Sequence, residues 1–212
     1  FGFSIDTQMT RVVREMNADR REKVILATGA YNWIIGHSPL KKALERALRR
    51  YRTDYIDVFH LLGVMQPREF APQIQDELNA LRADGRVRAT AISCHHRKFA
   101  GELAANGVVD ALMIRYNAAH PGAEVDIFPH VGEHGTGVVS YTATRWGRLL
   151  ARPRGWPSQE PVATAGQCYR WVLGNPAVQV VLTAPRNEAQ LAENLWEVEK
   201  GPLDDDEQEW MR

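Results

Sequence analysis

The chain has 212 residues, 44% of them apolar, so it can bury the core of one large domain or two small ones. Its 26 basic and 26 acidic side chains cancel, and no overall charge points to nucleic acid or a membrane surface as a partner. Cys94 and Cys168 do not make a disulfide framework, which favours a reducing cytoplasm. No apolar run reaches the ~18 residues of a membrane span, and the first residues lack the pattern of a signal peptide.

The first 51 residues alternate between strand-like and helix-like segments. Residues 1–6 alternate apolar and polar side chains, which predicts a strand that ends at Asp6. Residues 9–16 predict a short helix, and the apolar run of residues 23–28 predicts a buried strand. Ser38 and Pro39 are a favourable N-cap and first residue of a helix. Apolar side chains then recur with helical spacing at Leu40, Ala43, Leu44, Ala47, Leu48 and Tyr51.

The next segment, residues 53–64 with the sequence TDYIDVFHLLGV, is a short and nearly continuous apolar run. Such a run is typical of a parallel strand that is covered on both faces. A helix over residues 70–81 follows and is closed by Asp84 and Gly85, since glycine suits a left-handed C-cap. Strands are then predicted at residues 87–94 and 109–116, with a helix at 99–106 between them.

The last third of the chain continues the same alternation. A helix is expected near the middle of residues 117–137, then a strand at 137–142, and then a long exposed loop at 152–161 that is rich in Pro, Arg and Gly. A helix at 162–173 and a strand at 178–182 follow. The helix predicted at 187–199 turns Leu191, Leu195 and Val198 inward, and a short acidic helix covers residues 203–212.

Strands and helices that alternate about six times predict an α/β fold with a parallel sheet, either closed as a barrel or open and doubly wound. No GxGxxG follows a strand, which argues against a dinucleotide-binding doubly wound sheet. No linker or low-complexity segment divides the chain, so we expect one domain over residues 1–212.

Five segments in residues 53–195 resemble the successive signatures of the aldo-keto reductases. They are TDYIDVFHLL, GRVRATAISC, DALMIRYNAAH, GTGVVSYTATRWGRLL and VLTAPRNEAQLAENL. The resemblance implies a (β/α)8 TIM barrel, here with its N-terminal part incomplete, that binds NADPH across the carboxyl ends of its strands. NADH is the alternative cofactor. It further implies reduction of a small carbonyl substrate by hydride transfer.

The catalytic group of this family is an Asp, a Tyr, a Lys and a His, and the chain matches it only in part. Asp6 matches the Asp, but no tyrosine follows before a helix-like segment begins. Gly29 stands at the position of the Lys and Leu62 at that of the His. His60 lies two residues earlier on the same face, about 6.6 Å deeper along the strand. Asp6 and His60 are therefore the catalytic candidates.

The residues that the family uses for its cofactor are better matched. By resemblance, Ser93, Cys94 and Met113 fall at the carboxamide of the nicotinamide, and Tyr141 stacks on its ring. The segment at the pyrophosphate comprises Thr142, Ala143, Thr144 and Gly147. The residues at the adenosine end are Arg186, Gln190, Glu193 and Asn194. Arg186 beside a helix N-terminus suits a 2′-phosphate, because a guanidinium and the positive end of the helix dipole both favour an anion.

Several of these residues have a purely structural alternative. Gln190 and Asn187 form a capping pair on their own, and His60 in an apolar strand is compatible with a core histidine. Adjacent side chains of a strand point to opposite faces, so the Cys94-His95-His96 run does not predict a metal site. Two functions stay open: an NADPH-dependent reductase, and a barrel that binds a nucleotide or another ligand without standard carbonyl reduction. Other chemistry would use Arg115, His120, His95 or Arg145.

Overall fold

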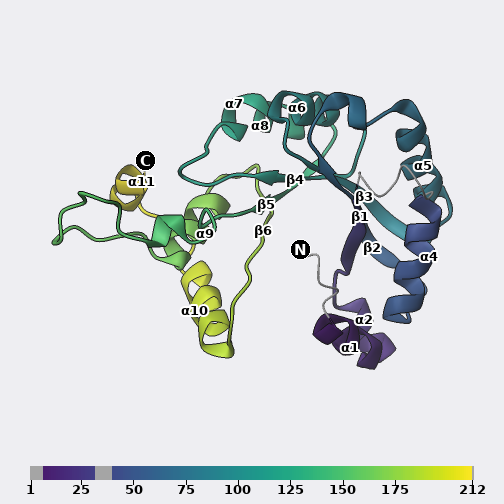
Figure 1. Ribbon diagram of the computed structural model, residues 1–212, viewed down its shortest axis with the longest axis horizontal. Helices are drawn as coiled ribbons and strands as arrows, with labels where there is room; N and C mark the ends of the chain where they lie inside the picture. The colour runs from purple at the N-terminus through teal and green to yellow at the C-terminus, as the bar shows by residue number, and fades with distance from the viewer. Residues whose placement is uncertain (1–6, 32–39, 212) are drawn as a thin grey trace. The chain divides into compact units, whose positions relative to one another are not determined.

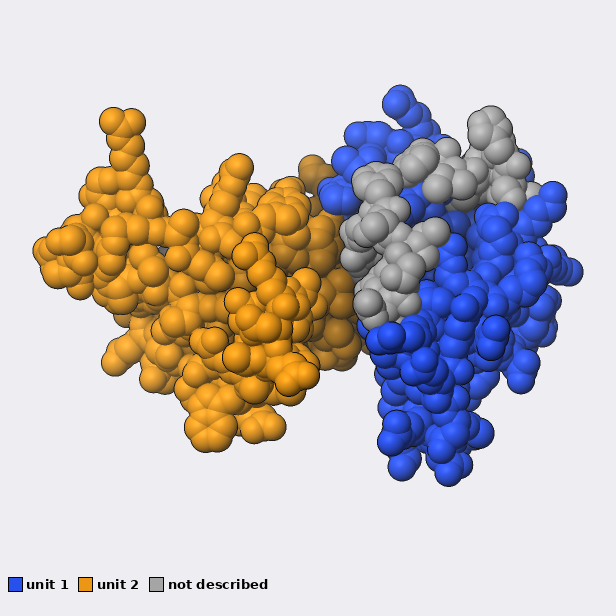
Figure 2. Space-filling view, turned by 60° about the horizontal axis from the view of Figure 1, so that its bottom comes forward, with its two compact units in different colours: residues 1–96, 108–110 blue, residues 97–107, 111–212 orange. Residues whose placement is uncertain are grey.

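The computed structural model describes residues 7–31 and 40–211, with side chains from Met9 onward. The chain separates into two compact units, which Figure 2 shows in different colours. Unit 1 comprises residues 1–96 and 108–110, and unit 2 comprises residues 97–107 and 111–212. No described helix is long and apolar enough to cross a membrane.

Unit 1 contains three parallel strands with β2 in the middle, and Figure 1 shows α4 and α5 beside them. The described elements of unit 1 are α1 (Thr7–Glu15), α2 (Ala18–Glu22), β1 (Ala27–Tyr31), α4 (Leu40–Tyr51), β2 (Ile56–Val64), η1 (Pro67–Glu69), α5 (Pro72–Ala83) and β3 (Val87–Cys94). The register places Gly29 of β1 and Ala91 of β3 on either side of His60. Fully buried Leu40 and Leu44 of α4, together with Phe59 and Leu61 of β2, belong to the core.

Unit 2 begins with a helix and contains three further strands, in which β4 pairs with β5 and β5 with β6, all parallel. Its described elements are α6 (Arg97–Ala105), β4 (Ala111–Arg115), α7 (Ala123–Asp126), α8 (Phe128–Val131), β5 (Gly137–Tyr141), η2 (Arg148–Leu150), α9 (Ala165–Leu173), β6 (Val180–Val181), α10 (Glu188–Glu199) and α11 (Asp205–Met211). Buried Tyr116 packs against the rings of Phe128 and Trp171, with centroids 4.9 and 4.8 Å away. Cys168 on α9 is also fully buried in this unit.

The strand predicted at residues 87–94 has these bounds in the structure, but the first predicted strand is displaced. β1 is Ala27–Tyr31 instead of residues 23–28, and Ile25 is 76% exposed. The backbone N–H of Leu26 donates to the carboxylate of Asp57, and the Leu26 carbonyl accepts from the backbone N–H groups of Asp57 and Val58. The predicted strand at residues 1–6 and the Ser38–Pro39 cap lie outside the described residues.

The prediction that Leu191 and Leu195 of α10 point inward is wrong, because they are 41% and 57% exposed. The inward side chain of this helix is Asn194, which is 8% exposed. Its amide donates to the hydroxyl of Thr183 over 3.0 Å, and that hydroxyl is 2.9 Å from the hydroxyl of Tyr169 on α9. A polar contact therefore sets the rotation of α10, and apolar spacing does not.

A buried carboxylate fixes the amino end of β2 in unit 1. Asp57 is 6% exposed and forms ion pairs with Arg21 and Arg88 at 2.8 and 2.9 Å. Both guanidinium groups also lie over the ring of Tyr55, 4.0 and 4.1 Å from its centroid. Arg21 is itself buried and donates to the carbonyls of Val24 and Tyr55. One carboxylate thus holds α2, β2 and β3 together.

We expect Asp57→Ala to lower the free energy of unfolding by about 3 kcal/mol, because removal of one partner leaves the buried Arg21 uncompensated. Urea unfolding followed by circular dichroism measures the change. Asp54→Ala, which removes an exposed carboxylate three residues earlier, is the control and should change stability by less than about 0.5 kcal/mol. Equal small losses in the two variants would show that the buried network contributes little.

Candidate functional site

The carboxyl ends of β4 and β5 in unit 2 are joined by one buried amide. Arg115 and Tyr141, the last residues of the two strands, are partners in the register. Two residues after Arg115, Asn117 is fully buried, and its side-chain amide donates to the carbonyl of Thr142 over 2.8 Å. The carbonyl of Asn117's side chain contacts Nδ1 of His120 at 3.0 Å. This amide therefore holds the segments that follow both strands in one arrangement.

The segment after β5 has an uncommon backbone. Thr142, Arg145 and Trp146 have φ of 58°, 51° and 54°, and Gly147 has φ of 80°. Non-glycine residues rarely adopt this left-handed region, and such conformations gather at functional sites. The loop is held by hydrogen bonds from the N–H of Arg145 to the carbonyl of Thr142 and from the N–H of Gly147 to the hydroxyl of Thr144.

Thr142 provides the most direct sign of a ligand in this segment. Its Oγ1 is buried and has no hydrogen-bond partner among the described residues. A buried hydroxyl without a partner is costly, and the cost is relieved when a ligand supplies one. Tyr141 beside it is half-buried, Ala143 is buried, and Thr144 and Gly147 are half-buried. The structure thus places the predicted ring-stacking and pyrophosphate residues on one continuous segment.

The residues predicted for the adenosine end of the cofactor lie just before and within α10. Only some of them form hydrogen bonds to other residues of the protein. The N–H of Arg186 donates to the side-chain carbonyl of Gln190, and the N–H of Gln190 donates to the side chain of Asn187, both over 2.9 Å. Asn194 is occupied by its bond to Thr183. The side chains of Arg186 and Glu193 are exposed. Asn187 therefore caps the helix, while Arg186 presents its guanidinium to solvent.

Three predicted cofactor residues are buried strand positions. Ser93 and Cys94 end β3 in unit 1, and Met113 lies in β4 of unit 2; all three are at most 5% exposed. Burial raises the pKa of the Cys94 thiol to about 11, and its Sγ donates weakly to the carbonyl of His96. Their contact with a nicotinamide carboxamide stays a prediction.

The two catalytic candidates, Asp6 and His60, have less support in the structure than the cofactor candidates. Asp6 lies outside the described residues. His60 is 3% exposed, and burial lowers its pKa to about 4, so its ring is neutral at pH 7. Gly29, at the family's Lys position, lies so close to β2 that an added Cβ would be 2.0 Å from the carbonyl oxygen of His60. Leu62, at the family's His position, is 5% exposed.

Sequence analysis did not single out Asn117, although a polar residue directly after a buried strand is the available signal. It did name His120, Arg115 and Arg145 as alternative chemistry, and the structure brings their charges together. The pKa of His120 is lowered by burial first and then by the positive charges of Arg115, Arg145 and Arg97. Arg97 is neutralised by Asp126 at 2.8 Å.

The sequence of this chain is similar to a known family of proteins. The sequence pattern described as the aldo/keto reductase family matches residues 7–160. The chain belongs to this family. The prediction from sequence is confirmed at the level of family and of α/β fold class.

Two curated relatives have similar sequences. The uncharacterized oxidoreductase YqkF of Bacillus subtilis is 24% identical over 220 residues, which cover 87% of this chain and 71% of the relative. The methylglyoxal reductase YeaE of Escherichia coli is 25% identical over 181 residues, which cover 82% of this chain and only 55% of the relative. This chain therefore spans only part of the length of each relative, 71% of the first and 55% of the second.

Solved structures share the fold. The aldo-keto reductase AKR11C1 of Bacillus halodurans in its apo form has a TM-score of 0.74 at 24% identity, covering 95% of this chain and 75% of that one. An aldo/keto reductase of Klebsiella pneumoniae in complex with NADP and acetate has a TM-score of 0.75 at 22% identity, covering 95% and 74%. At these identities the likeness shows the fold alone.

The close approach of β1 to β2 gives a direct test at Gly29. We expect Gly29→Ala to lower the free energy of unfolding by at least about 2 kcal/mol, because the new methyl group forces the His60 backbone away. Chemical denaturation measures the loss. Gly132→Ala is the control, since a Cβ there meets no atom within 4 Å. A neutral Gly29→Ala would show that the two strands separate easily.

His60 makes stability depend on pH. Its folded pKa of about 4 lies below the ordinary histidine pKa of 6.5, so the unfolded chain binds more protons between these two pH values. Stability is then lost as the pH falls from 6.5 to 4, by roughly 3 kcal/mol from this residue. Urea unfolding across this window should show a shallower pH dependence in His60→Gln, which cannot titrate. The same slope in both proteins would refute a buried neutral histidine.

Proposed function

We propose that this chain is a single barrel domain over residues 1–212 that binds NADPH and acts as an oxidoreductase on a small carbonyl substrate. Family membership supports the proposal, and the observation that carries it is the segment after β5, where Tyr141 precedes a left-handed loop and a buried hydroxyl without a partner. The related Klebsiella pneumoniae enzyme was solved in complex with NADP.

The donor set of unit 2 fits a dinucleotide. Tyr141 offers a half-buried aromatic face for a nicotinamide ring. The hydroxyl of Thr142 offers a donor to a pyrophosphate, and the left-handed loop that follows it brings the chain to Gly147. The exposed guanidinium of Arg186, next to the N-terminus of α10, suits a 2′-phosphate and favours NADPH over NADH.

A bound nicotinamide supplies the hydride, and the protein has to supply a proton to the alkoxide oxygen that develops. The described residues lack the family's tyrosine, lysine and histidine at their positions. His60 does not replace them, because it is buried and neutral.

A second candidate function is nucleotide binding without carbonyl reduction. The packing of Gly29 against His60 favours it, since the space for a longer side chain at the lysine position is filled by the β2 backbone. Buried Leu62 offers no polar atom at the histidine position.

We expect the purified protein to bind NADPH, detected as a change in nucleotide fluorescence. Arg186→Gln should weaken the binding of NADPH at least about tenfold and leave the binding of NADH nearly unchanged, because only NADPH carries the 2′-phosphate. Lys98→Gln, an exposed charge removed elsewhere in unit 2, is the control. Absence of NADPH binding, or equal losses for both nucleotides, would contradict the assignment of Arg186.

Turnover of a generic aldehyde by the NADPH-loaded protein separates the two candidates. A reductase consumes NADPH only when the aldehyde is present, whereas a protein that only binds the nucleotide leaves NADPH unchanged. NADPH binding without any turnover selects the second candidate, and turnover of the aldehyde contradicts it.

A further inference from the structure

Unit 2 contains a pocket that none of the predicted cofactor residues line. It has a volume of about 230 Å³ and lies between the segment after β5, the loop of residues 151–163 and α11. Figure 1 shows this long loop beside α11. The lining residues are Ala118, Arg145, Arg148, Leu149, Ala151, Pro153, Trp156, Pro161, Val162, Ala163, Trp210 and Met211.

The charged residues of the pocket are of one sign. Arg145 and Arg148 line it, and no aspartate or glutamate does. Neither guanidinium forms an ion pair with a described residue. Two unpaired cations that share a concave and mostly apolar surface create a positive potential there, and such a surface attracts an anion.

The remaining wall is apolar and partly aromatic. Trp156 and Trp210 are 41% and 37% exposed, so each indole presents part of its surface to the pocket. The indole N–H of Trp156 donates to the carbonyl of Pro161 over 3.1 Å, which fixes the ring. Arg152 donates to the carbonyls of Pro157 and Glu160 and closes the same loop. A flat apolar group would find a fixed aromatic surface here.

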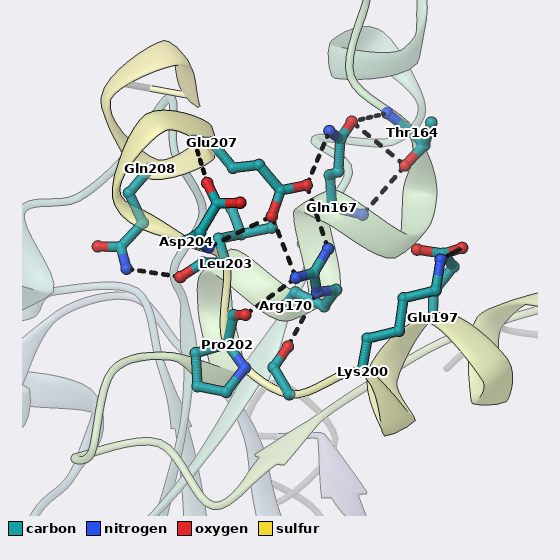
Figure 3. A network of polar contacts seen from close by, with 11 residues as sticks. Thr164, Gln167, Arg170, Glu197, Lys200, Pro202, Leu203, Asp204, Glu207 and Gln208 are labelled. Carbon is teal, nitrogen blue, oxygen red and sulfur yellow. Dashed lines mark hydrogen bonds and ion pairs between the residues drawn. The ribbon is translucent and has the colours of Figure 1, made fainter.

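The third wall, α11, is anchored by one guanidinium on α9. Arg170 donates to the carbonyls of Gly201 and Pro202, both over 2.9 Å, and to the carboxylate of Glu207. Figure 3 shows Arg170 between Pro202 and Glu207. Its ion pair with Glu207 spans 3.1 Å, and the Arg170 side chain is 10% exposed. Because α11 is fixed in this way, Trp210 is held in place without needing a ligand.

Arg145 is also positioned in advance. Its left-handed backbone is tied to Thr142, whose carbonyl accepts from both the N–H of Arg145 and the amide of Asn117. A residue held in such a conformation marks a site where the surrounding contacts determine the geometry. The backbone that carries this guanidinium is therefore fixed before a ligand binds.

We propose that this pocket binds a small organic anion with a flat apolar body, of the aryl carboxylate class. The guanidinium groups of Arg145 and Arg148 take the carboxylate, and the indoles of Trp156 and Trp210 take the ring. A volume of about 230 Å³ suits a molecule of one or two rings, smaller than a typical drug-sized ligand. No predicted nucleotide residue lines the pocket, so we expect this ligand to bind beside NADPH.

Calorimetry of the full chain with 2-naphthoate, with and without saturating NADPH, tests the proposal. The neutral analogue 2-naphthalenemethanol, which keeps the rings and lacks the charge, should bind at least about tenfold more weakly. Arg145→Asn and Arg148→Gln should each weaken the binding of 2-naphthoate at least about tenfold and leave the binding of the alcohol unchanged. Asparagine is chosen at position 145 because it tolerates the left-handed backbone better than most residues. Trp156→Leu should weaken both compounds.

Arg154→Gln is the matched control, because it removes an exposed charge of the same loop that does not line the pocket. It should leave the affinity for 2-naphthoate within about twofold of the unsubstituted protein. Equal affinity for the acid and the alcohol, or insensitivity to Arg145→Asn and Arg148→Gln, would overturn the proposal. Displacement of 2-naphthoate by NADPH would also overturn it, and so would binding of a poly-glutamate peptide by a protein that does not bind 2-naphthoate. If NADPH failed to bind, the proposed function would be contradicted, but the affinity for 2-naphthoate would still test this pocket.

Discussion

The hydrogen bond from the Asn117 amide to the carbonyl of Thr142 is the contact on which the functional surface of unit 2 depends. It joins the chain just after β4 to the chain just after β5 in a fully buried position, where an amide without partners would be costly. The same carbonyl accepts from Arg145, and the same side chain orients His120. The segment after β5 that we propose for the nucleotide and the pocket that we propose for the anion thus share a single support. An apolar residue at position 117 would remove this hydrogen bond and so weaken the support of both.

Unit 1 shows the opposite relation between structure and chemistry. In the positions where the family keeps a lysine and a histidine, this chain has a glycine against a strand and a buried leucine. These are well-packed positions, and they contribute to the core instead of to a reaction. His60, which resembles a catalytic remnant in the sequence, is part of that core and stays neutral.

Much of the fold follows from the sequence because periodicity and burial agree. The run at Val87–Cys94 and the stripe that begins at Leu40 are placed correctly, since apolar burial alone decides them. The prediction fails where a polar contact decides. Asn194 takes the inward position on α10 that the spacing gives to Leu191 and Leu195, and the carboxylate of Asp57 binds the N–H of Leu26 just before β1. The left-handed backbone at Arg145 and Trp146 could not be predicted, because neither residue type prefers it.

The two cysteines are distributed with one in each unit, Cys94 at the end of β3 and Cys168 on α9. Burial raises the pKa of both thiols to about 11, so neither forms a reactive thiolate near neutral pH while its surroundings are folded. Opening of either unit exposes a single sulfur to alkylation. The native chain thus carries an intrinsic chemical reporter in each half, and mass spectrometry after pulse labelling reads out whether the halves open together or one before the other.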